Sequence, residues 1–232
     1  MKDHHHHGSE PRDTHDSHNH GDHSHAPGHR HPNQPDHDDT LTYYRKLEMA
    51  VRELLIEKGI ITADEVRKVV EDIESRSPEG GARVVARAWS DPAFKEELLR
   101  DATAACTRMG FEMALYDVKL TVVENTSEVH NMVVCTLCSC YPRMLLGLPP
   151  AWYKSRAYRS RAVREPRAVL REFGLELPDT VSVRVHDSTA DLRYLVLPMR
   201  PAGTEGMTEA ALAAIVTRDS MIGTAVLRPP AR

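Results

Sequence analysis

Apolar residues recur at helical spacing from residue 45 onwards and predict a run of helices over residues 41–110. The first helix stops at Gly59, and its apolar positions lie three and four residues apart: Leu47, Ala50, Val51, Leu54 and Leu55. Thr62 and Glu65 have the spacing of a capping box, which predicts a second helix to about Ser75. A third helix is predicted after Pro78, running through Trp89.

The next helix is predicted to start at Asp91-Pro92, because proline is favoured in the first turn, and to continue from Phe94 to Met109. Cys106 lies near the end of this helix on its apolar side. We interpret Cys106 as a small buried core thiol and not as a ligand.

Beyond residue 110 the pattern changes to short runs rich in β-branched residues. Four runs read as strands: Leu120–Val123, Met132–Val134, Val181–Val185 and Leu192–Leu197. The last two are joined through Asp187–Asp191, which predicts a hairpin. Thr208 is the expected cap of a final helix that carries Leu212, Ile215 and Val216. The whole pattern predicts an α+β protein, with a helical arm over 41–110 and a mixed domain over 111–232.

Residues 1–40 carry almost no apolar residues and hold twelve of the fourteen histidines, between His4 and His37. Such a segment cannot bury enough surface to offset its chain entropy, so we expect a disordered His-rich tail. The scatter of histidines favours a native tail over an expression tag. Either it binds divalent metal loosely through neutral imidazoles, or it is a solvated tail with incidental affinity.

Charge and composition exclude several partners. The tail holds eight acidic and three basic residues, which leaves 26 acidic and 27 basic residues in the remainder, so nucleic acid is not expected as a partner. No apolar run approaches the roughly 20 residues of a membrane helix, so a membrane is not expected either. Basic residues gather between Arg143 and Arg171, and few aromatics accompany them. We interpret this basic patch as a salt-bridged subunit interface and not as an RNA-binding face.

Three of the four cysteines lie within six residues, Cys135-Thr136-Leu137-Cys138-Ser139-Cys140, which we call the claw. Three thiolates this close can hold one metal ion from one side, and the intervening backbone amides come within bonding distance. Spacing alone leaves three interpretations: a soft-metal or redox site, a structural zinc site, or buried inert cysteines. A disulfide framework is disfavoured, since the cysteines are few and clustered and no secretory segment opens the chain.

The claw and several other stretches resemble the α subunits of the nitrile hydratase family. These stretches are Val123–Thr126, Val129–Val134, Gly147–Lys154, Tyr158–Arg161, Arg164–Arg167, Arg200–Thr204 and Val216–Gly223. The resemblance covers roughly residues 45–225. It implies that the helical arm is followed by a layered α-β-β-α domain, so that 111–232 is the metal-binding catalytic domain.

The resemblance also implies a role for each residue of the claw. Cys135, Cys138 and Cys140 would supply three sulfur ligands, and the backbone nitrogens of Ser139 and Cys140 would complete the ligand set. Cys138 would be oxidised to sulfinate and Cys140 to sulfenate, states that burial and a partner subunit must protect. Thr136 stands where iron enzymes of the family usually have serine, which implies low-spin Co(III) in preference to iron.

The implied reaction is the hydration of a nitrile to an amide without redox turnover. The attacking group would be either a metal-activated water or the sulfenate oxygen of Cys140, and Ser139 would hydrogen-bond solvent at the metal. Cys140 and Ser139 are therefore the expected catalytic residues. The expected partners are one or more β-type subunits, a cobalt-insertion activator protein and a small-molecule nitrile, in the cytoplasm.

Three departures from the family pattern point to unusual specificity, such as a nucleoside nitrile. Arg143 replaces the common tryptophan after Tyr141-Pro142, Phe111–Leu120 lacks the usual pocket glutamine, and Met207 stands where an aromatic residue is usual. One alternative is the cobalt-bearing γ subunit of thiocyanate hydrolase, which shares the Cys-Tyr-Pro-Arg sequence and a His-rich tail. Another is a non-catalytic metal-binding protein that holds metal mainly through its tail.

Overall fold

The computed structural model describes residues 41–113 and 118–228, so the tail expected to be disordered over 1–40 lies outside the described residues. Two helices come first, α1 (Tyr43–Glu57) and α2 (Ala63–Ser75), and neither has a buried residue. The predicted capping box is confirmed. The Thr62 hydroxyl accepts from the Glu65 amide at 3.1 Å, and the Glu65 carboxylate accepts from the Thr62 amide at 2.7 Å.

Three further helices follow: α3 (Glu79–Ser90), α4 (Pro92–Arg100) and α5 (Ala102–Arg108). Helix α4 starts at Pro92 as expected, and the structure adds that the Asp91 side chain caps it by accepting from the amides of Ala93 and Phe94. The single helix predicted from Phe94 to Met109 is wrong, because Asp101 leaves the helical conformation between α4 and α5. Its carboxylate accepts from the Ala104 amide at 3.0 Å, so this aspartate starts a new helix.

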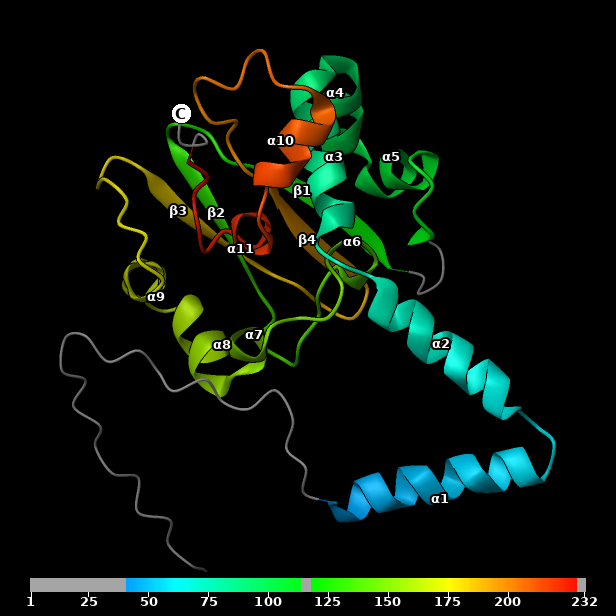
Figure 1. Cartoon of the computed structure of the whole chain (residues 1–232). Coiled ribbons are helices and arrows are strands. Elements are labelled where there is room, and N and C mark those ends of the chain that lie inside the picture. The colour runs from blue at the N-terminus through cyan, green and yellow to red at the C-terminus, as the bar shows by residue number, and fades with distance from the viewer. Residues whose placement is uncertain (1–40, 114–117, 229–232) are drawn as a thin grey trace, which may run out of the picture. The chain divides into compact units, whose positions relative to one another are not determined.

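The four predicted strands are present, as β1 (Lys119–Glu124), β2 (Val129–Val134), β3 (Ser182–Asp187) and β4 (Leu192–Leu197). The predicted hairpin between β3 and β4 is wrong. β1 pairs with β4 and β2 pairs with β3, both in parallel, giving two two-stranded sheets (Figure 1). Parallel pairing needs a long crossover, which the helices between β2 and β3 provide.

The crossover contains four short helices, α6 (Arg143–Leu146), α7 (Ala151–Lys154), α8 (Arg156–Ala162) and α9 (Pro166–Glu172). Two more follow β4: α10 (Glu209–Ile215), capped by Thr208 as predicted, and α11 (Arg218–Ile222), which the sequence pattern does not predict. Helix α11 lies against β2 and β4, and α9 lies against β3 (Figure 1). The expected α+β class, with helices layered on the strands, is confirmed.

One hydrophobic core joins α3, α4 and α5 to the strands and the later helices. Val85 and Leu98 are fully buried, as are Leu195 of β4 and Met221 of α11. The boundary expected near residue 110, between arm and catalytic domain, stays a prediction. No helix within the described residues is long and apolar enough to cross a membrane.

Candidate metal centre

The claw begins where β2 ends, and the register of the sheet fixes its first turn. Val134 pairs with Asp187 at the end of β3, and the Ser188 amide donates to the Val134 carbonyl at 2.7 Å. The Asp187 carboxylate then accepts from the Thr136 amide at 2.9 Å and from the Thr136 hydroxyl at 2.6 Å. The strand pairing therefore places Asp187 where it holds Thr136 of the claw, although the two residues are 51 positions apart in the sequence.

The three sulfur atoms of the claw converge. All lie within 4.8 Å of one another, with 3.6 Å between Cys135 Sγ and Cys138 Sγ and 3.3 Å between Cys138 Sγ and Cys140 Sγ. The Cys138 amide also donates to Cys135 Sγ at 3.3 Å. Cys135 and Cys140 are buried, and Cys138 is exposed. Three thiols turned to one point fit a soft or borderline metal ion.

The pKa values of Cys138 and Cys140, the last two thiols of the claw, are shifted in opposite directions. The Cys140 thiol beside Cys138 lowers the pKa of Cys138, and the backbone amides of Ser139 and Cys140 act in the same direction. Burial raises the pKa of Cys140 to about 12, and the hydrogen bond with Cys138 acts in the same direction. Cys138 is therefore the more readily ionised of this pair, and the amides between the cysteines face its sulfur.

The other residues singled out in the sequence lie in different surroundings. Ser139 is half-buried between Cys138 and Cys140. Cys106 is fully buried, and burial raises the pKa of its thiol to about 12, which confirms the prediction of a core thiol. His130, the imidazole nearest in sequence, is buried and hydrogen-bonded to the Gly223 carbonyl at 2.7 Å. Across 41–113 and 118–228, the claw is the one group of three residues arranged to hold a metal.

Besides Arg159, which donates to the Thr136 carbonyl, sequence reasoning missed three residues whose side chains contact the claw or the strand that leads into it. The sequence pattern places Asp187 in a hairpin turn, which gives no sign of its contact with Thr136. Tyr153 and Tyr158 lie in stretches that carry the family resemblance, and their hydroxyls donate to the carbonyls of Cys140 and Val133. Their signal in the sequence is weak, because a tyrosine in a short helix does not reveal which carbonyl it meets.

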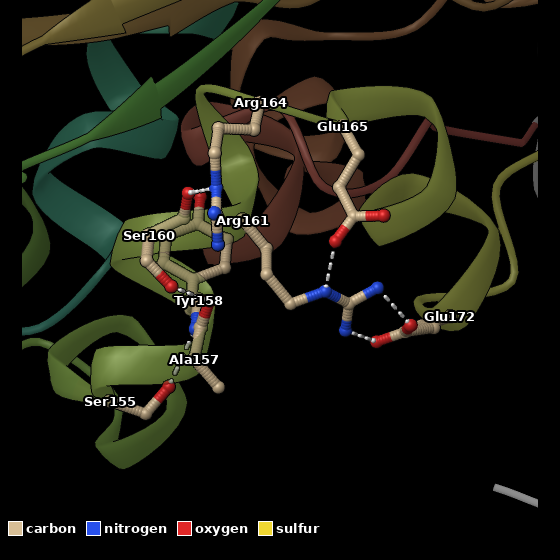
Figure 2. A network of polar contacts seen from close by, with 8 residues as sticks. All are labelled: Ser155, Ala157, Tyr158, Ser160, Arg161, Arg164, Glu165 and Glu172. Atoms are coloured by element: carbon tan, nitrogen blue, oxygen red, sulfur yellow. Dashed lines mark hydrogen bonds and ion pairs between the residues drawn. The ribbon is translucent and has the colours of Figure 1, made fainter. Parts of the chain in front are cut away.

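The basic patch is partly neutralised within the chain (Figure 2). Arg161 pairs with Glu165 and Glu172, both at 2.6 Å, and the Arg164 guanidinium donates to the Ser160 carbonyl at 3.1 Å. Arg159 reaches the claw, where it donates to the Thr136 carbonyl at 3.4 Å. The patch therefore braces α8 beside the claw, and its predicted role as a subunit interface stays a prediction.

A claw of three thiols at the end of a parallel strand in an α+β fold defines the chain as a candidate metal-binding subunit. A model of the family described as "Nitrile hydratase, alpha chain" matches residues 42–225. The chain belongs to the nitrile hydratase α-chain family, which confirms the resemblance found in its motifs.

Similar proteins include subunits of two kinds of enzyme. The chain is 53% identical over 184 residues to the low-molecular weight cobalt-containing nitrile hydratase subunit alpha of Rhodococcus rhodochrous, covering 79% of this chain and 88% of that protein. It is 46% identical over 193 residues to the thiocyanate hydrolase subunit gamma of Thiobacillus thioparus, covering 79% of each chain. Among solved structures, a double mutant of the Fe-type nitrile hydratase from Comamonas testosteroni Ni1 matches with a TM-score of 0.75. The sequence identity in that match is 42%, and it covers 81% of this chain and 91% of that one.

Proposed function

We propose that this chain is the metal-bearing subunit of a nitrile hydratase and that it holds cobalt in the claw. The observation that carries the proposal is the convergence of the three sulfurs of Cys135, Cys138 and Cys140 within 4.8 Å. Cobalt in preference to iron is supported by Thr136 and by the 53% identity to a cobalt-containing subunit. An Fe-type nitrile hydratase has a similar fold, so cobalt is supported by the sequence and not by the fold.

Within this proposal, each residue of the claw has a task. Cys135, Cys138 and Cys140 hold the metal through sulfur, and the backbone nitrogens of Ser139 and Cys140 complete the set. When bound, cobalt supplies a Lewis acid that polarises a nitrile or acidifies water without changing oxidation state. The Ser139 hydroxyl, half-buried in the claw, orients the reacting water. Oxidation of Cys138 and Cys140 belongs to the same proposal, and exposure and a lowered pKa favour it at Cys138.

A β-type partner subunit is part of the proposal, because the chain leaves apolar side chains uncovered. Leu47, Val51 and Leu54 of α1 are 46%, 47% and 48% exposed, and Leu137 in the claw is 78% exposed. An apolar helix face of this kind is usually covered by another chain. We expect the isolated chain to bind metal and to turn over little substrate. A cobalt-insertion activator protein and a cytoplasmic location complete the proposal.

Thiocyanate hydrolysis is the second candidate, and one residue favours it. Arg143 is exposed at the start of α6, three residues after Cys140. A cation there would attract an anionic substrate such as thiocyanate, whereas an uncharged nitrile, including a nucleoside nitrile, gains nothing from it. Glu124–Thr126 and Gly147–Pro150 are closer to the hydratases, so we favour the nitrile.

The complex of this chain with its partner subunits should be assayed with nitriles and with thiocyanate in parallel. We expect amide formation from a nitrile, with thiocyanate consumed at least about tenfold more slowly. The variant Arg143→Trp should change the thiocyanate rate more than the nitrile rate. Faster use of thiocyanate would contradict the hydratase assignment. No turnover, with metal lost on deletion of residues 1–40, would indicate a non-catalytic metal-binding protein.

A further inference from the structure

Two buried tyrosine hydroxyls bond to the backbone at and near the claw, one at its last residue and one in β2 two residues before it begins. Tyr158 donates to the carbonyl of Val133, in β2 just before the claw, at 2.7 Å. Tyr153 donates to the carbonyl of Cys140, the last residue of the claw, at 2.8 Å. The two tyrosines, Tyr158 and Tyr153, are 5% and 0% exposed, so water does not compete for either bond. One bond thus holds the last residue of the claw, and the other holds the strand that leads into it.

The two tyrosines are held in place by aromatic packing and by the cap of α8. Their ring centroids are 5.6 Å apart, and Trp152 packs edge-on against Tyr158 at 4.9 Å and against Phe173 at 4.7 Å. Ser155 caps α8 by accepting from the Tyr158 amide at 3.1 Å. Figure 2 shows the polar contacts of the same helix, where Arg161 joins α8 to Glu165 and to Glu172 on α9. The hydroxyls are therefore presented by packed helices.

The chemistry of these hydroxyls suits a structural clamp. Burial raises the pKa of both tyrosines far above the usual value, so each hydroxyl stays protonated and remains a donor. Each donates to a backbone carbonyl and neither is exposed, so neither is placed to contact substrate. Their action on the site must pass through the backbone that carries the sulfurs.

We propose that Tyr153 and Tyr158 are positioning residues, which clamp the last residue of the claw and the strand that leads into it so that the three sulfurs converge before metal arrives. The proposal rests on the proposed function for its purpose, since a metal site profits from ligands that are already oriented. The pairing with β3 and the Asp187 carboxylate hold the β2 end of the claw, so without the tyrosines it is mainly the Cys140 end that can shift away from the other two sulfurs. Metal binding would then have to bring the three sulfurs together, and the free energy that this ordering costs would weaken the affinity for the metal.

The test uses arsenite on the full-length chain and on the variants Tyr153→Phe and Tyr158→Phe. Trivalent arsenic bonds three neighbouring thiols and releases one water for each As–S bond, so its affinity reports whether the sulfurs converge. It prefers thiols to imidazoles, and the tail contains no cysteine, so the histidines do not interfere. We expect each variant to bind arsenite about tenfold more weakly than the wild-type chain, in the range usual for residues that orient metal ligands.

Tyr141→Phe is the matched control. Tyr141 directly follows the claw and its ring lies 5.2 Å from that of Tyr153, but its buried hydroxyl has no hydrogen-bond partner among the described residues. This variant should bind arsenite about as tightly as the wild type. Unchanged affinity in Tyr153→Phe and Tyr158→Phe, or an equal loss in Tyr141→Phe, would overturn the proposal.

Cobalt uptake, measured on the same variants, separates this proposal from the proposed function. If the two clamp variants bind arsenite about tenfold more weakly than the wild-type chain, the clamp stands whether or not cobalt binds. If the claw then takes up no cobalt in the presence of partner subunits, the proposed function fails by itself. Thermal unfolding of each variant tests whether the fold is retained. If Tyr158→Phe does not fold, the arsenite affinity of Tyr153→Phe alone decides between the outcomes.

Discussion

At the scale of single residues, a buried polar network links three of the family-like stretches, Val123–Thr126, Val129–Val134 and Val216–Gly223. His130 Nε2 donates to the Gly223 carbonyl at 2.7 Å, so its Nδ1 is the acceptor for the Asn125 amide at 3.3 Å. The Asn125 side-chain oxygen accepts in turn from the Asn131 backbone amide at 2.7 Å, and His186 Nε2 donates to Asn131 Oδ1 at 2.8 Å. His130 is neutral in this arrangement, burial lowers the pKa of His186, and the network ties the residue after β1 to β2 and β3.

This network predicts a loss of stability in acid. Burial lowers the pKa of His130 below its unfolded value of about 6.5, so the unfolded chain takes up the proton first. The stabilisation is present above about pH 6.5 and is lost as the pH falls towards the folded pKa. Urea unfolding between about pH 7.5 and 5 should show this, and His130→Gln should flatten the slope by up to about 1.4 kcal/mol per pH unit. An unchanged slope in the variant would contradict the neutral, buried assignment.

At the scale of elements, the turn after α11 depends on a close backbone approach. Gly223 has φ +88°, and a Cβ there would collide with the Asn131 carbonyl oxygen in β2. Gly59, after α1, has φ +64°, and no atom lies within 4 Å of the position that its Cβ would take, which makes it a matched control. We expect Gly59→Ala to cost about 1 kcal/mol and Gly223→Ala about 3 kcal/mol or more, measured by urea unfolding. Equal losses would show that the contact with β2 is not tight.

The elements that could be predicted from the sequence are those fixed by near neighbours. The Thr62 capping box, the helix start at Asp91-Pro92 and the four strands follow from local spacing, and they are present. The partners of β3 and β4 could not be predicted. The short turn between these strands suggests a hairpin, but β3 pairs with β2 across a crossover of four helices, and β4 pairs with β1. The break at Asp101 is hidden in the sequence, since apolar spacing continues through it while its side chain caps α5.

At the scale of the whole molecule, the candidate site is partly local and partly distant. The three cysteines and Ser139 could be found from the sequence because they lie within six residues. Asp187, Tyr153 and Tyr158 could not, because their contacts with the claw or its ends depend on strand register and helix packing. The apolar face of α1 is exposed, so we expect a partner chain to cover it. We therefore predict that catalysis needs that partner chain.

Metal analysis with intact mass and peptide mapping tests the central claim most directly. It should compare the wild-type chain, co-expressed with its partner subunits, with a variant in which Cys135, Cys138 and Cys140 are replaced by serine. Because the tail histidines are the same in both, the difference counts only metal held by the claw. We predict about one cobalt per wild-type chain, absent from the variant, with added oxygen confined to the peptide containing residues 135–140. Equal metal in both proteins, or zinc with unmodified cysteines, would contradict a hydratase-type centre.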